Sequence, residues 1–172
     1  VVPSGSCAAT IRVFYLEIFD DDTELLAEAK ALAAKTYEFS EFLVNVLNVE
    51  DASVCGASHE GTVTYHPSCH LLRELGVKSE PQKLLQSVPG LEQKELEGAE
   101  ICCGFGGTFS VKFPHISEGM VTDKVANIQA SGADTLVSCD MSCLMNIGGY
   151  LNRQESAIKV RHLAQILDPE SE

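Results

Sequence analysis

The chain lacks several features that would indicate common classes of function. It has no run of 18 apolar residues, which a membrane-spanning helix would need, and no secretory signal peptide. Positive charge is scarce, because 12 Lys and Arg stand against 25 Asp and Glu, for a net charge of −13. Such a chain has no basic field to attract phosphates. We therefore expect a cytoplasmic protein that is not membrane-spanning and binds no nucleic acid.

Familiar catalytic motifs are missing as well. The sequence contains no paired carboxylates placed for acid–base work, no Ser–His–Asp order and no P-loop. Yet 172 residues, 45% of them hydrophobic, are enough for a domain with a sizeable core. Any chemistry must come from another set of side chains, and cysteine supplies it.

Seven cysteines are present, and the most informative two are adjacent, in the stretch GAEICCGFGGT at 98–108. Neighbouring side chains diverge on a helix or a strand, but a glycine-rich turn lets both point at one object. Glycine also lets the backbone approach that object closely. The adjacent pair is Cys102 and Cys103, and the glycines are Gly104, Gly106 and Gly107.

Three further cysteines extend this group. Cys69 precedes Cys102 with 32 residues between them, and Cys139 follows Cys103 after 35 residues, with Cys143 just beyond. An odd number of cysteines without a secretory signal favours reduced thiols that bind metal or carry out redox chemistry, rather than a disulfide framework.

Short β-rich segments alternate with helical ones, which predicts an α/β fold with a parallel sheet flanked by helices. The clustered cysteines follow strand ends, so they should meet at the carboxyl edge of the sheet, where ligands bind. The predicted strands are 61–65, 134–138 and 158–160, with the end of another at 1–2. The predicted helices are 8–19, 23–48 (with a break near Ser40 as the alternative), 71–75, 81–86, 117–130, 144–151 and 162–167.

A weak internal repeat appears when the chain is shifted by 136 residues. It suggests that 1–50 is the tail of a first repeat plus a long helix, 51–60 a linker, and 61–172 a complete second repeat. On this interpretation Cys7 is a ligand whose partners lie in sequence that is absent here. The matching pairs are Val1 with Val137, Ser6 with Ser142, Cys7 with Cys143 and Ile11 with Ile147.

Several thiolates set in glycine loops suit an iron–sulfur cluster, whose properties respond to hydrogen bonds on sulfur. Zinc is the alternative, with His66 or His70 beside Cys69 as a further ligand and His70 as the best candidate among the histidines. Thiol–disulfide exchange at the adjacent pair is a third, although a vicinal disulfide is strained. Cys139 and Cys143 compete for the last ligand place, and the repeat favours Cys143.

Four stretches closely resemble the cysteine-rich "CCG" domain family of iron–sulfur proteins. They are VVPSGSCAA, HPSCHLLRELGV, ICCGFGGTFSVK and DMSCLMNIGGYL. The resemblance is strongest to the lactate-oxidising branch, and more distant to iron–sulfur subunits of glycolate oxidase and of heterodisulfide reductase. Such proteins carry two CCG repeats, which implies that part of the first is missing here.

The resemblance implies that a 4Fe–4S cluster is bound at the family's cysteine positions, matched here by Cys69, Cys102, Cys103 and Cys143. Asp140 stands where the family has the first cysteine of CxxC, and Cys139 lies one residue earlier, so four or five thiolates could bind. The implied function is an electron-transfer subunit in the oxidation of L-lactate to pyruvate, with other iron–sulfur subunits as partners. Two alternatives are a zinc-bound structural or interaction module and a disulfide-reducing subunit.

Overall fold

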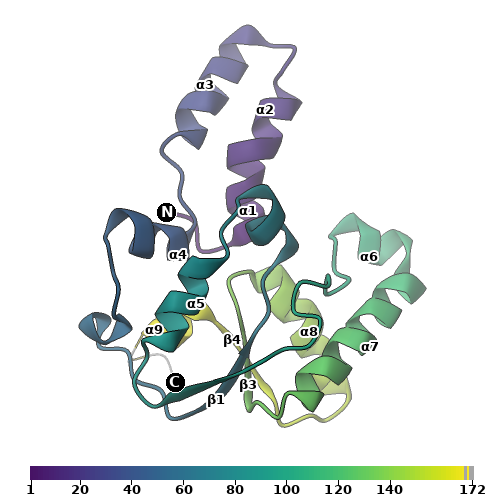
Figure 1. The fold of residues 1–172 in the computed structure, drawn as a ribbon. Helices are drawn as coiled ribbons and strands as arrows, with labels where there is room; N and C mark the ends of the chain where they lie inside the picture. The colour runs from purple at the N-terminus through teal and green to yellow at the C-terminus, as the bar shows by residue number, and fades with distance from the viewer. Residues whose placement is uncertain (169, 171–172) are drawn as a thin grey trace.

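A computed structural model describes residues 1–168 and 170 as a sheet covered by helices on both faces, with a helical arm above it (Figure 1). The four strands are β1 (Gly61–Tyr65), β2 (Leu91–Lys94), β3 (Thr135–Ser138) and β4 (Lys159–His162). All neighbours are parallel, in the order β2-β1-β3-β4. The predicted α/β fold is therefore confirmed, and β2 is a strand that the sequence analysis missed.

The sheet separates two hydrophobic clusters because side chains of a strand alternate between its faces. On β3, Val137 belongs to the cluster under α5 and α9, whereas Leu136 belongs to the cluster under α7 and α8. These helices are α5 (Ser79–Gln86), α9 (Leu163–Leu167), α7 (Pro114–Ala130) and α8 (Met141–Arg153). The other short elements of the body are η3 (Ala52–Cys55), the π-helical turn η4 (His70–Glu74), α6 (Thr108–Lys112) and α4 (Phe39–Glu41), which continues as η2 (Phe42–Val46).

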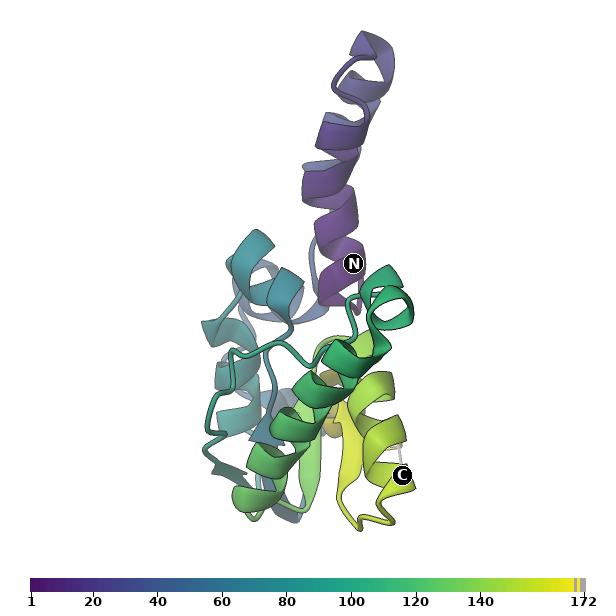
Figure 2. The same cartoon turned by 90° about the vertical axis from the view of Figure 1, so that its right-hand side faces the viewer.

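The arm contains two antiparallel helical segments that extend away from the body (Figure 2). The first runs continuously through α1 (Gly5–Ala9), the π-helical turn η1 (Thr10–Phe14) and α2 (Tyr15–Ile18), and the second is α3 (Thr23–Ala33). The single helix predicted over 23–48 is wrong, because α3 ends at Ala33 and a new helix begins at Phe39. The apolar positions belong to two surfaces: Leu25 and Leu32 of α3 are 42% and 39% exposed, whereas Phe39 packs on the core of the body.

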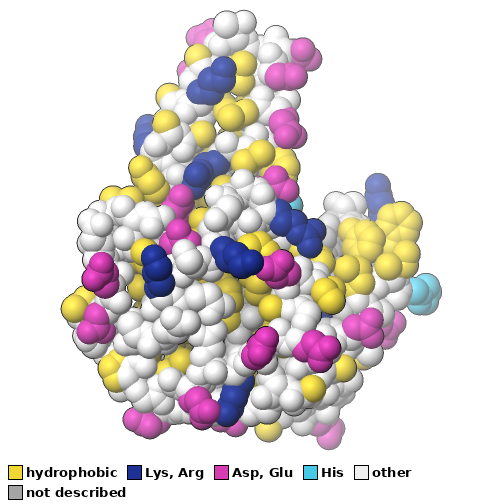
Figure 3. Space-filling model, viewed as in Figure 1, with side chains coloured by type: hydrophobic (Ala, Val, Ile, Leu, Met, Phe, Trp, Pro, Cys, Tyr) yellow, Lys and Arg dark blue, Asp and Glu magenta, His cyan; other side chains and the backbone are white. Residues whose placement is uncertain are grey.

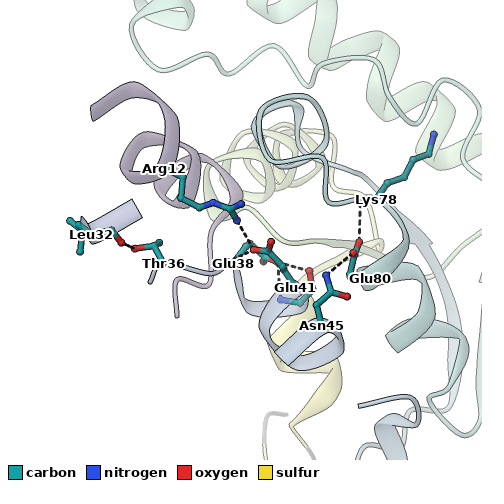
Figure 4. Close-up of polar contacts among 9 residues, drawn as sticks. Arg12, Leu32, Thr36, Glu38, Glu41, Asn45, Lys78 and Glu80 are labelled. Carbon is teal, nitrogen blue, oxygen red and sulfur yellow. Dashed lines mark hydrogen bonds and ion pairs between the residues drawn. The ribbon is translucent and has the colours of Figure 1, made fainter. Parts of the chain in front are cut away.

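Polar contacts hold the base of the arm to the body (Figure 4). Arg12 forms an ion pair with Glu41, 2.6 Å from Nη1 to Oε2. Glu41 also accepts a hydrogen bond from the backbone N–H of Glu38, the residue that caps α4. Asn45 donates to Glu80 of α5 at 3.0 Å, which extends the contacts to the next helix.

Residues 2–41 repeat the local structure of 138–165. Val2 forms a single parallel bridge with Glu38, just as Ser138 pairs with His162 between β3 and β4. In both segments the first residue of the pair is followed by a helix whose N-cap is a polar side chain. The second residue of the pair starts another helix with a capping box. The caps are Ser4 and Asp140, and the capping boxes are at Glu38 and His162. The division at 51–60 into linker and second repeat stays a prediction.

None of the helices in the described part of the chain has both the length and the apolar character needed to cross a lipid bilayer.

Candidate metal centre

The predicted site lies where the strand order reverses. From β1 the chain crosses to β2 on one side and then to β3 on the other, which leaves a crevice above the carboxyl ends of β1 and β3. A cavity of about 410 Å³ opens there. It is lined by residues that follow β1, β2 and β3 and by the start of α1: Ser6, Ser68, Cys69, His70, Cys102, Cys103, Phe105, Gly106, Gly107, Thr108, Asp140, Ser142 and Cys143.

Four of the predicted cysteines meet in this cavity, and we refer to Cys69, Cys102, Cys103 and Cys143 as the cysteine centre. The thiol of Cys102 contacts those of Cys69 and Cys103, and Cys103 in turn contacts Cys143. Cys103 and Cys143 are buried, while the other two are half-buried. Residues from three separate segments therefore bring four thiols into one continuous group.

The thiols of this group do not ionise alike. Contacts with Cys103 and then Cys69 lower the pKa of Cys102, against the effect of burial, and the backbone N–H of Gly104 donates to its sulfur at 3.4 Å. The pKa values of Cys69 and Cys103 are raised, chiefly because their protons are shared with Cys102. Contact with Cys103 lowers the pKa of Cys143 to about 6, with the neighbouring His66 acting in the same direction. Two of the four cysteines, Cys102 and Cys143, thus favour thiolate, the form of cysteine that binds metals.

His66 is the histidine of this site, and sequence reasoning had favoured His70 instead. His66 follows directly after β1 and is fully buried, and one of its ring nitrogens lies within 4.8 Å of the sulfurs of Cys103 and Cys143. Neither ring nitrogen has a hydrogen-bond partner among the described residues. His70 is exposed and stacks edge-on against Phe14 of the arm. A buried imidazole without partners indicates a site built to hold something more.

Asp140, which the family resemblance sets at a cysteine position, joins the two halves of the chain. Its carboxylate caps α8 by accepting from the backbone N–H groups of Ser142 and Cys143. The other oxygen accepts from the N–H of Ser6 at 2.8 Å, at the start of α1. Burial alone would raise the pKa of Asp140, but these hydrogen bonds lower it, so the group stays charged. This capping role was not anticipated from the sequence.

Gly104 lets the cysteine loop lie directly on α7. Its φ is +87°, and a Cβ there would lie 2.7 Å from the carbonyl oxygen of Ser117 and 2.9 Å from the Cβ of Met120. Gly106 and Gly107 also have positive φ, and both line the cavity. The expectation that glycines shape the turn holds at these positions.

Three other cysteines lie apart from the centre. Cys139 is on the same face of the sheet as Val137, in the cluster under α5 and α9, where its sulfur accepts from the hydroxyl of Tyr65 at 3.6 Å. Burial raises its pKa well above the usual value. Cys7 is exposed on α1, and Cys55 is exposed in the 51–60 segment. Ligand roles for Cys139 and Cys7 stay predictions.

The surface is hollowed between the arm and α6, and hydrophobic side chains gather over α6 (Figure 3). Val111, Phe113 and Ile116 are all more than half exposed. Cavity residues 105–108 lead directly into this helix, so the opening of the cysteine centre has an apolar border on that side.

Comparison with known proteins agrees with this arrangement. A family model described as a cysteine-rich domain, CCG, matches residues 63–148, from β1 through the first half of α8. Lactate utilization protein A of Lysinibacillus sphaericus is 53% identical over 168 residues, which are 98% of this chain and 72% of that protein. The proteins of the same name from Geobacillus kaustophilus and Bacillus subtilis are 54% and 51% identical, over 98% of this chain and 69% of theirs.

The resemblance inferred from the motifs is confirmed by these matches. Identity above 50% extends across both the arm and the sheet, well beyond the cysteine motifs that first suggested the relationship. This chain belongs to the cysteine-rich CCG domain family and, within it, to the family of lactate utilization protein A.

Proposed function

We propose that the cysteine centre binds a 4Fe–4S cluster and that the chain carries electrons in a lactate oxidation system. The observation that supports this most is the convergence of four thiols from three segments in one cavity, with Cys102 already stabilised as a thiolate. When bound, such a cluster supplies reversible one-electron transfer. The name shared by the relatives supports lactate as the source of the electrons.

The residues fit this group in chemistry and in access. Thiolates are the ligands of iron–sulfur clusters, and Gly104 already donates its N–H to the sulfur of Cys102. Buried Cys103 and Cys143 would fix the inner side of the group, whereas half-buried Cys69 and Cys102 would hold its outer side near the opening. A site of this kind lies near enough to the surface to exchange electrons with partner subunits that also carry iron–sulfur clusters.

Zinc is a second candidate because of His66. With Cys103 and Cys143 it forms a three-residue group within 4.8 Å, and either remaining cysteine would complete a site with three cysteines and one histidine. Such a site would be structural, and the chain would then be an interaction module without redox activity. The main support for this alternative is that neither ring nitrogen of His66 has a hydrogen-bond partner among the described residues.

The metal content of anaerobically purified protein separates the two. We expect about four irons and four sulfides per chain, with a broad visible absorption that bleaches with dithionite. Serine variants of each cysteine in the centre should lose most of the iron, whereas C55S, at an exposed cysteine apart from the centre, is the control and should retain it. Stoichiometric zinc without visible absorption, lost in a His66→Asn variant, would instead establish the zinc site.

A further inference from the structure

A lysine interrupts the apolar face of α7 behind the cysteine centre. Val121, Val125 and Ile128 of this helix are buried in the same cluster as Cys103 and Cys143. Lys124 shares their face at helical spacing and is only 1% exposed. A charged residue in a core position costs free energy unless something compensates it. Departures from the apolar pattern of this kind tend to mark functional sites.

The ammonium group of Lys124 holds the segment that leads into the cysteine loop. Its Nζ donates to the carbonyl oxygens of Gly98 at 2.6 Å and of Ala99 at 3.1 Å. Together with the contact of Gly104 on Ser117, this makes α7 the support of the loop on both sides of the cysteine pair. These contacts satisfy two donors of Lys124 but do not neutralise its charge.

No carboxylate in the described part of the chain forms an ion pair with that charge. None of the ion pairs found among the described residues includes Lys124. The acidic groups that favour its charged form are the thiols of the cysteine centre, with Cys103 foremost. Burial lowers the pKa of Lys124, and these thiols oppose that shift when they are ionised, as they are when they bind a metal.

We propose that Lys124 is a positioning residue that also tunes the cysteine centre, because its buried positive charge offsets the negative charge of the group bound there. This inference rests on the proposed cluster. Reduction adds one electron to the bound group, so a nearby cation stabilises the reduced form more than the oxidised form. The cation therefore raises the reduction potential, and little solvent is present to screen the effect.

The test compares the potential of the cluster in four variants, by reductive titration followed by visible absorption and electron paramagnetic resonance. K124M removes the charge and keeps the apolar packing, and K124Q removes the charge but can still donate to the two carbonyls. K124R keeps the charge. K112M is the matched control, because it removes the same charge from an exposed site at the end of α6.

At a fixed solution potential, we expect the ratio of reduced to oxidised cluster to fall by about tenfold in K124M and K124Q. For a one-electron couple this is a shift of about 59 mV to more negative potential. K124R and K112M should stay within about twofold of the unsubstituted chain. K124M and K124Q could also fold without metal but fail to retain iron. If K124R retains iron in that case, the result would also support the inference, because the centre would then need the positive charge to hold its bound group.

Unchanged potentials in K124M and K124Q would overturn the inference, as would unfolding of their metal-free forms, since Lys124 would then serve only to hold the loop. Thermal unfolding by circular dichroism distinguishes that case. Failure of the proposed function gives a different result, because the unsubstituted chain would then contain no iron and sulfide to titrate.

Discussion

Glu38 and Asp140 are both buried carboxylates at helix starts, yet their surroundings shift their pKa values in opposite directions. Asp140 receives hydrogen bonds from two helices, and these outweigh the effect of burial and lower its pKa. For Glu38 burial dominates and raises the pKa, although Ser40 and Glu41 donate hydrogen bonds to it. One oxygen of Glu38, Oε1, has no partner among the described residues. Glu38 is therefore a cost to stability whenever it is ionised.

The sign of its pH dependence follows from this shift. A carboxyl whose pKa is higher in the folded state contributes stability below its unfolded value of about 4.5, and that contribution is lost as the pH rises through the folded value. We expect Glu38→Gln to be more stable than the unsubstituted chain at pH 8, by on the order of 1 kcal/mol, because the neutral amide avoids a buried charge. Urea unfolding of the metal-free chain under reducing conditions measures the difference.

The advantage of the Gln variant should shrink as the pH falls below 5. Glu28→Gln is the control, since it removes the same charge from an exposed position on α3 and should change stability little at either pH. An advantage that stays constant from pH 4 to pH 8 would contradict the assignment of the effect to ionisation of Glu38.

At the residue scale, the chain order predicted that five cysteines lie at one edge of the sheet, but it did not predict which face each one occupies. Cys69, Cys102, Cys103 and Cys143 follow strands whose carboxyl ends had to share an edge. Cys139 follows β3 just as closely, yet strand alternation turns it to the opposite face with Val137. His66 and Lys124 could not be assigned, because their roles depend on packing between segments that are distant in sequence.

At the element scale, the cysteine loop and α7 act as one unit, and Gly104 is the point where they touch. Gly104→Ala would combine a side chain at φ +87° with a Cβ 2.7 Å from the carbonyl oxygen of Ser117. Strain of the left-handed backbone costs about 1–2 kcal/mol and overpacking about 1–3, so we expect a loss of about 2–5 kcal/mol. The displaced loop should also lose iron. Denaturant unfolding and iron analysis check the two effects.

Gly132→Ala is the matched control for this prediction. Gly132 follows α7 with φ +69°, but a Cβ there would have no neighbour within 4 Å, and it lies at the end of the helix away from the loop. It should cost only the backbone strain, about 1–2 kcal/mol, and leave the iron content unchanged. Equal losses in both variants would mean that contact with α7 does not position the loop.

Helices and strands were predictable where their residues show helical periodicity or the alternating, β-rich pattern of a strand. The β-rich segments of β1 and β3 and the periodic helix α7 lie close to where they were expected. β2 reads LEQK and was missed, because an edge strand with charged residues lacks the apolar alternation that identifies strands. The prediction of one helix over 23–48 was wrong because periodicity identifies apolar stripes but not the surface against which each stripe packs. Here the stripe of α3 and the stripe that begins at Phe39 belong to different surfaces.

At the scale of the whole molecule, the cysteine centre ties together segments that the sheet alone connects loosely. Cys69 leads into η4, Cys102 and Cys103 belong to the loop before α6, and Cys143 lies in the first turn of α8. A bound group that contacts all of them closes the carboxyl edge of the sheet. The α3 helix of the arm is outside this closure, because Ala29 is its one buried residue.

Loading of the centre should therefore stabilise the body and leave α3 unaffected. A group bound only by the folded state, at 100 to 1,000 times its dissociation constant, adds about 3–4 kcal/mol. For a chain of this length that raises the thermal midpoint by about 5–15 °C.

Hydrogen exchange should slow together at 66–74, 102–108 and 140–146, because one bound group restrains all three segments. Exchange in α3 should be the same with and without metal, since its stability comes from its own hydrogen bonds and few tertiary contacts. If metal loading slowed exchange in only one of the three segments, a shared centre would be contradicted. If loading slowed exchange in α3 as much as in these segments, α3 and the body would open as one unit.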